Sequence, residues 1–146
     1  MEESFKIKGE LDIKLFDQYG NLKQELKHHN TVKNAGLYGL LDQTLASPTL
    51  AKVGWMAIGT GSPAATLLGT ELDRNALTSK TRTDAVLTMV GDWAAGDGTG
   101  AITEAGLFDV VTANTVNMWC SASFDAINKG ASDALQITWT LTISTS

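Results

Sequence analysis

A strict alternation of side chains near the end of the chain constrains the fold more than any other feature of the sequence. Large apolar side chains occupy every second position from Leu135 to Ile143, and glutamine or threonine fills the positions between them. A β-strand turns successive side chains to opposite faces, so this pattern predicts a strand with one face in a core and the other toward solvent or a second protein. Burying five such side chains stabilises a fold by about 7 to 15 kcal/mol before entropy is subtracted. We therefore expect this strand to lie centrally in a sheet.

The chain opens with a second alternating segment. Between Phe5 and Leu15 apolar side chains take odd positions, and mostly charged ones take even positions. Turn-forming residues follow at 17–21, so residues 22–27 are expected to return as the partner strand of a hairpin. The apolar run 53–58 is typical of a strand that is buried on both faces. Further strands are expected at residues 75–83, 85–90, 102–111 and 116–124.

Between Asn30 and Ala46 the period of the pattern changes. Apolar residues now recur at intervals of three and four, which predicts a helix that ends before Ser47 and Pro48. Asn30, Thr31 or Asn34 could cap its start. Two glycines inside the segment, Gly36 and Gly39, each weaken a helix by about 1 kcal/mol relative to alanine. We expect this helix to cover one face or end of a sheet.

The order of these segments indicates a mainly β protein. Glycines and aspartates predict a loop at 91–100, and residues 128–133 form the expected turn into the last strand. The count is seven or eight strands and one helix, which favours an antiparallel β-sandwich or barrel. A chain of 146 residues suits one domain, so residues 1–146 are expected to fold as a single unit.

Composition excludes several classes of function. The formal net charge of -5 argues against a nucleic-acid partner, because nonspecific binding to phosphates rests on lysine and arginine. No apolar run approaches the roughly 20 residues that span a bilayer, and the acidic start of the chain is unlike a signal peptide. We therefore expect a protein without a membrane partner that is made in the cytoplasm. The single cysteine, Cys120, lies in an apolar run and is interpreted as a buried structural thiol.

Two patterns superficially suggest chemistry. Gly59-Thr60-Gly61 is similar to a phosphate-binding loop, but it lacks the lysine and hydroxyl residue that would contact the phosphates, so we interpret it as a structural turn. Neighbouring His28 and His29 would point to opposite sides of a strand and could not bind one metal ion together. Neither pattern predicts a cofactor.

Acidic residues offer the remaining candidates. Asp92 and Asp97 could supply oxygens to calcium, although their spacing does not match a calcium loop and a solvated turn is the simpler interpretation. Glu71, Glu104 and Asp109 lie closest to apolar segments, where a carboxyl group could act as a general acid if it were paired in a cleft. The simpler expectation for Glu104 is that it accepts hydrogen bonds from turn amides or pairs with a lysine or arginine. We expect no catalytic residues and no enzymatic activity.

Two motifs and the closing strand resemble those of a known family. The first motif is Ile58-Gly59-Thr60-Gly61, then Pro63, Thr66, Leu68-Gly69-Thr70-Glu71 and Arg74. The second is Ile102-Thr103-Glu104-Ala105-Gly106-Leu107-Phe108. With the strand 135–143 and the preceding hairpin and helix, the chain resembles, over nearly its whole length, a widespread group of small virion proteins of tailed bacteriophages.

The resemblance implies a structural protein of the virion. Some members of that group decorate the capsid as cement proteins, and others belong to tails or fibres. The first interpretation implies a decoration protein that bridges and stabilises subunits of the major capsid protein, with a homotrimer favoured by sites of local threefold symmetry. The alternative is a tail, fibre or baseplate adaptor, whose partners would be tail proteins.

The residues that would contact a partner are predicted from the four tryptophans. Trp55 and Trp139 fit core positions, so Trp93 and Trp119, together with Asp92 and Asp97, are expected at an interface. Replacing Trp93 with alanine should then leave the fold intact and weaken attachment to the particle. A carbohydrate- or receptor-binding module, with Trp93 beside the two aspartates, is a third possibility.

Overall fold

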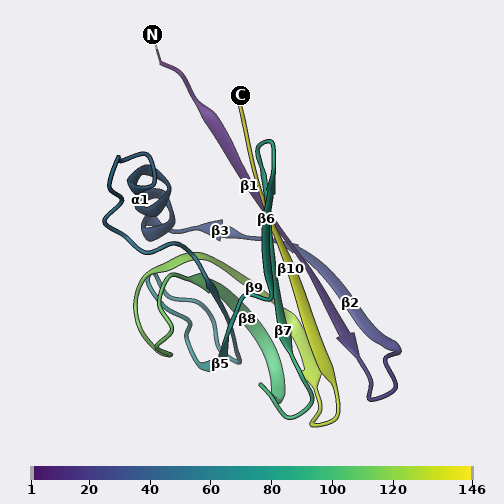
Figure 1. Ribbon diagram of the computed structural model, residues 1–146. Coiled ribbons are helices and arrows are strands. Elements are labelled where there is room, and N and C mark those ends of the chain that lie inside the picture. Colours follow the sequence, from purple (N-terminus) through teal and green to yellow (C-terminus); the bar gives the residue numbers. More distant parts are fainter. Residues whose placement is uncertain (1, 146) are drawn as a thin grey trace.

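The computed structural model describes residues 2–145, which form two five-stranded antiparallel sheets and one helix (Figure 1). The ten strands in the described residues exceed the predicted seven or eight. In spatial order, the first sheet contains β2 (Leu22–His29), β1 (Phe5–Phe16), β10 (Ala134–Thr145), β7 (Val86–Trp93) and β6 (Ser79–Thr83). The second contains β3 (Thr31–Val32), β9 (Met118–Lys129), β8 (Gly100–Phe108), β4 (Trp55–Gly59) and β5 (Glu71–Ala76). Helix α1 (Asn34–Asp42) follows β3.

The central position predicted for the last strand is confirmed. β10 lies between β1 and β7, and its register sets Leu11 opposite Trp139 and Ile13 opposite Ile137. These four side chains are buried, whereas Ile143 at the far end of the strand is exposed. The alternation therefore continues beyond the part of the sheet that has a core beneath it.

The two sheets share one hydrophobic core. Its buried cluster joins Leu11 and Ile137 of the first sheet to Met56 and Ile102 of the second. A Cβ placed on Gly91 of β7 would lie 2.8 Å from the sulfur of Met56. Because glycine leaves this space open, a methionine of one sheet reaches a strand of the other.

One predicted strand is in fact two strands of different sheets. Residues 75–83 were expected to form a single polar strand, but β5 ends at Ala76 and β6 begins at Ser79. Between them the Leu77 amide donates to the carbonyl of Gly54, and the next amide, that of Thr78, donates to Val90 of β7. The chain therefore crosses from the second sheet to the first between these two residues.

The helix is shorter than predicted because its first residues belong to a strand. Thr31 and Val32 pair with Ser121 and Cys120 of β9, so the helix begins at Asn34. Neither Asn30 nor Thr31 caps it; the capping position is Lys33, which makes no side-chain capping hydrogen bond. The helix packs against β9.

Candidate interaction surface

The structure corrects the prediction that Trp93 faces a partner. β7 runs through Trp93, where a loop had been expected, and pairs this residue with Leu135 of β10. The side chain is only 1% exposed and belongs to the shared core. A buried indole offers no face on which a sugar ring could stack, so Trp93 cannot serve the carbohydrate-binding alternative in the way the sequence suggested.

Trp119 is also a core residue, which corrects its assignment to an interface. Its side chain is 6% exposed and lies beneath α1, where a Cβ on Gly39 would overlap the indole ring. The indole N–H donates to the carboxylate of Asp109 at 3.2 Å. A polar partner for the ring nitrogen and a helix above the ring together explain why this tryptophan is buried.

The structure does not bring Asp92 and Asp97 together as ligands for calcium. Both carboxylate oxygens of Asp92 accept hydrogen bonds, one from the side-chain amide of Gln136 at 3.0 Å and the other from the hydroxyl of Thr78. Asp97 is exposed in the turn after β7. Among residues 2–145, no group of three or more histidine, cysteine, aspartate or glutamate side chains is placed to hold a metal ion.

Glu104 supports the glycine-rich turn of the first motif, as expected. Its carboxylate is fully buried and accepts the backbone N–H groups of Gly69 at 2.6 Å and Thr70 at 3.3 Å. A Cβ on Gly61 would lie 2.7 Å from one carboxylate oxygen. The neighbouring Thr103 donates its hydroxyl to the carbonyl of Gly61. Glycine is needed there because the backbone passes close to this carboxylate, so the turn is structural.

The remaining acidic candidates also have structural partners. Glu71 and Arg74 form an ion pair at 2.7 Å, and each side chain is 1% exposed. The guanidinium lies 3.7 Å from the ring centroid of Phe108 and donates to the carbonyl of Val110 at 2.9 Å. Such a pair is strongly destabilising to break, because either partner alone would be a buried charge. The carboxyl groups of Glu71, Glu104 and Asp109 therefore have separate partners.

Exposed apolar side chains gather on α1 and the segment that follows it. We call this set the α1 strip, and it consists of Leu37, Tyr38, Leu41, Leu45 and Leu50. Leu41 is 69% exposed, although leucine is usually buried. The carboxylate of Asp42 fixes the following segment by accepting the backbone N–H groups of Thr49 and Leu50. Exposed apolar side chains concentrated in one segment make that segment a candidate site of protein contact.

Sequence reasoning missed the α1 strip because it ranked tryptophans above leucines. The available signal was the helical pattern itself, since Leu37, Leu41 and Leu45 recur every four residues while Leu40 and the glycines lie on another side. A helix that is apolar on two sides needs two partners. The sheet supplies one of them.

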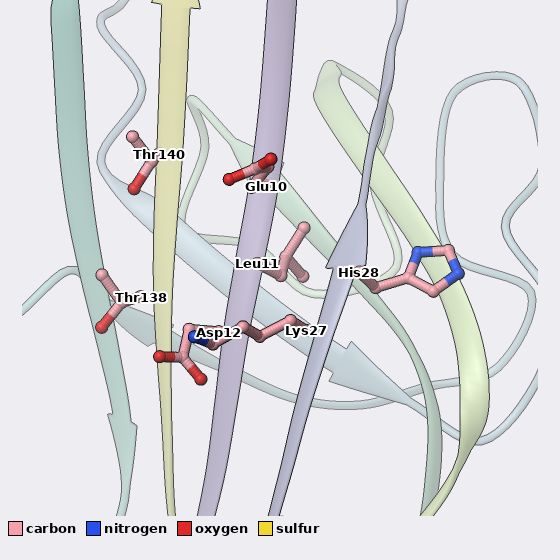
Figure 2. Close-up of a pocket in the computed structure, with 7 residues that line it drawn as sticks. All are labelled: Glu10, Leu11, Asp12, Lys27, His28, Thr138 and Thr140. Carbon is pink, nitrogen blue, oxygen red and sulfur yellow. The ribbon is translucent and has the colours of Figure 1, made fainter.

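The outer face of the first sheet carries an open depression of about 440 Å³ (Figure 2). Figure 2 shows Glu10 and Asp12 on one face of β1 beside Thr138 and Thr140 of β10, whereas His28 points away from them. Lys8 lies 2.9 Å from Glu10, and Lys14 lies 3.9 Å from Asp12. Exposed ion pairs of this kind contribute little to stability. The arrangement is that of a solvated sheet face.

Two further sequence expectations have clear outcomes. Cys120 is buried as predicted, and burial raises the pKa of its thiol to about 12. The side chains of His28 and His29 do not point to opposite sides of the strand. Their rings stack with centroids 4.5 Å apart at the end of β2, where the chain leaves the sheet.

Comparisons place no known protein beside this one. The chain matches no family model, no curated protein and no solved structure. Within residues 2–145, the helix is neither long nor apolar enough to cross a membrane.

Proposed function

We propose that the chain is a structural protein of a tailed-phage virion, folded as a β-sandwich, and that it decorates the capsid as a cement protein. The observation that carries this proposal is the α1 strip, an apolar surface left uncovered on a chain whose buried acidic groups serve the scaffold. A protein that works by attachment needs such a surface, and the resemblance to phage virion proteins supplies the class of partner.

The residues that resemble those of phage virion proteins have structural roles, and these roles support the proposal. Glu104 holds the turn around Gly61 and Gly69, and the Glu71–Arg74 pair joins β5 to the segment after β8. These contacts stiffen the second sheet at the edge formed by β4 and β5. A stiff domain loses little conformational freedom on docking, which favours binding.

A cement protein stabilises the assembled shell by binding to it. When one copy contacts two neighbouring subunits of the major capsid protein, separating those subunits also costs the contacts of the cement protein, so the assembled shell is stabilised. The α1 strip provides the apolar centre that such an interface requires. A tail, fibre or baseplate adaptor is the alternative placement in the virion.

The number of copies in purified virions tests the proposal. Quantitative mass spectrometry against the major capsid protein should give on the order of hundreds of copies at a fixed ratio to the capsid subunit, because every equivalent site of the shell is occupied. A handful to a few tens would assign the protein to the tail. Absence from the virion would reject both placements.

A further inference from the structure

The N-terminal half of β1 has an open edge. Residues 5–9 pair with β10 on one side, but β2 pairs with β1 only from Glu10, which lies opposite His29. The amide of Asn30 donates to the carbonyl of Gly9 and closes the edge at that point. Within the described part of the chain, no strand pairs with residues 5–8 on this side. Figure 1 shows this part of β1 extending past the end of β2, its neighbour on this side.

The backbone groups on this edge can be assigned from the ladder. The amide of Ile143 donates to the carbonyl of Ala85 on the β7 side of β10. Backbone groups alternate in direction along a strand, so the odd residues of β10 form hydrogen bonds toward β7 and the even residues form them with β1. Their partners on β1 are Lys6 and Lys8. The N–H and C=O groups of Phe5 and Ile7, the odd residues in this part of β1, therefore point to the open side. Such an edge is a template for one more strand.

We propose that this edge binds the same segment of a second copy of the chain, as an antiparallel strand about a two-fold axis. The axis passes between the two copies of Phe5, which face each other as a hydrogen-bonded pair. In this register Ser4 lies opposite Lys6 of the second copy, and Glu2 lies opposite Lys8. Because the contact is isologous, each of these pairs occurs twice.

The charges disfavour the two registers that pair residues further along β1. Residues that lie opposite each other must have side chains on the same face of the sheet. Each alternative register is therefore shifted so that the two paired residue numbers add up to a sum that differs by two. When Phe5 lies opposite Ile7, Lys6 faces Lys6 of the second chain and Glu2 faces Glu10. When Ile7 lies opposite Ile7, Lys6 faces Lys8. Both place like charges opposite each other, which is destabilising. The register centred on Phe5 avoids these pairs and sets Glu2 opposite Lys8. The register centred on Ser4 sets Glu2 opposite Lys6, but it pairs fewer residues of this edge.

The apolar side chains agree with this arrangement. Phe5 is 64% exposed, because it extends past the core beneath the sheet. Across a hydrogen-bonded pair the two Phe5 rings contact each other and cover part of this surface. The existing Lys8–Glu10 ion pair does not oppose the new contact, since both side chains are well exposed and free to rearrange.

This contact differs from the trimer that the resemblance implies, and it does not depend on the proposed virion function. Sedimentation equilibrium of the full chain over a concentration series up to about 1 mM should give the mass of two chains, in the range where a short strand pairing is populated. A monomer throughout, or a trimer, overturns the proposal. Copy number in virions tests the function separately.

Cysteine cross-linking reads out the register. Facing residues of a hydrogen-bonded pair have Cα atoms about 5.5 Å apart, which suits a disulfide. Under mild oxidation Phe5→Cys should form a covalent dimer faster than Lys6→Cys or Ile7→Cys, and the buried Cys120 serves as an inert background. Faster cross-linking at either neighbouring position would overturn the proposed register.

A charge exchange tests the same contact without an oxidant. Glu2→Lys and Lys8→Glu should each raise the dimer dissociation constant about tenfold, and the double variant should restore it. Glu3→Lys is the matched control, because it makes the same change in net charge at a position that does not face Lys8. Equal weakening by the control, or no restoration in the double variant, contradicts the pairing.

Discussion

At the scale of single residues, two glycines determine how closely α1 approaches the second sheet. A Cβ on Gly36 would lie 2.5 Å from the carbonyl oxygen of Trp119, and one on Gly39 would overlap its indole ring. Their cost to the helix is therefore outweighed by the close packing that they permit. Because the backbone lies so near the ring, a short helix is enough to bury a tryptophan.

Replacing Gly39 with alanine should destabilise the protein by up to about 2 kcal/mol, since overpacking costs about 1 to 3 kcal/mol and the gain in helix propensity returns about 1 kcal/mol. Denaturant unfolding followed by tryptophan fluorescence measures the change. Tyr38→Ala, on the exposed side of the same helix, is the control and should shift stability by less than about 0.5 kcal/mol. A Gly39→Ala variant that is more stable than the wild type would contradict the packing argument.

Asp42 gives stability a dependence on pH. Hydrogen bonds from the hydroxyl of Thr49 and the amides of Leu50 and Thr49 hold the pKa of this carboxyl below its ordinary value of 3.8. A group whose pKa is lowered by folding contributes stability above the unfolded pKa and loses it as pH falls through the folded pKa. The contribution of Asp42 is therefore complete above about pH 4 and lost below it.

Asp42→Asn should accordingly flatten the loss of stability as the pH falls below about 4. Urea midpoints of wild type and variant across this range provide the test. Asp17 and Asp133, whose pKa values are also lowered by hydrogen bonds, maintain part of the slope in both proteins. Parallel curves for the two proteins would show that Asp42 does not take part.

At the scale of elements, helix α1 has one side on the sheet and another toward solvent. Leu41→Lys should weaken attachment to the virion by at least about tenfold while leaving stability within about 0.5 kcal/mol, because the charge enters an apolar contact but not the core. Binding of the purified variant to particles that lack the protein measures the effect.

The matched control for Leu41→Lys is Tyr19→Lys, which introduces the same charge at a residue 79% exposed in the β1–β2 turn. If the control weakens attachment equally, the loss is due to charge and not to the α1 strip. Unchanged binding of Leu41→Lys would exclude the strip as the docking surface.

Elements with a simple period were predictable from the sequence, and elements that change sheets were not. Apolar and polar side chains alternate along β1 and β10, and this periodicity predicts which face of each strand is buried. Residues 75–83 are polar and rich in threonine on both sides of the change of sheet between Leu77 and Thr78, so the end of β5 and all of β6 were predicted as one strand. Likewise, Gly91 indicated a loop, but glycine is present there to admit the side chain of Met56.

The site was less predictable than the fold. The role of Glu104 followed from the general need of a buried carboxylate for donors, and the structure confirms it. Trp93 and Trp119 were assigned to an interface by residue type, yet burial depends on which face of a strand a residue occupies and on what lies above it. Nothing in local sequence shows that a helix will cover Trp119.

At the scale of the whole molecule, the shared core makes the two sheets one cooperative unit. Trp93→Ala should therefore lower the free energy of unfolding by about 3 to 5 kcal/mol, in place of the neutral effect that the sequence suggested. Far-ultraviolet circular dichroism and fluorescence should still give coincident transitions. Two separated transitions would mean that the sheets unfold independently.

The central place of β10 has a consequence for synthesis. Chains emerge from the ribosome from the N-terminus onward, and every strand of the second sheet precedes β10 in the sequence. β1 and β7, by contrast, are joined in the first sheet only by β10, which lies between them and is made after both. Until β10 is made, the second sheet can form, but the β1–β2 and β6–β7 hairpins have no strand to join them over its apolar face. The two sheets therefore close on one another only after translation has passed β10.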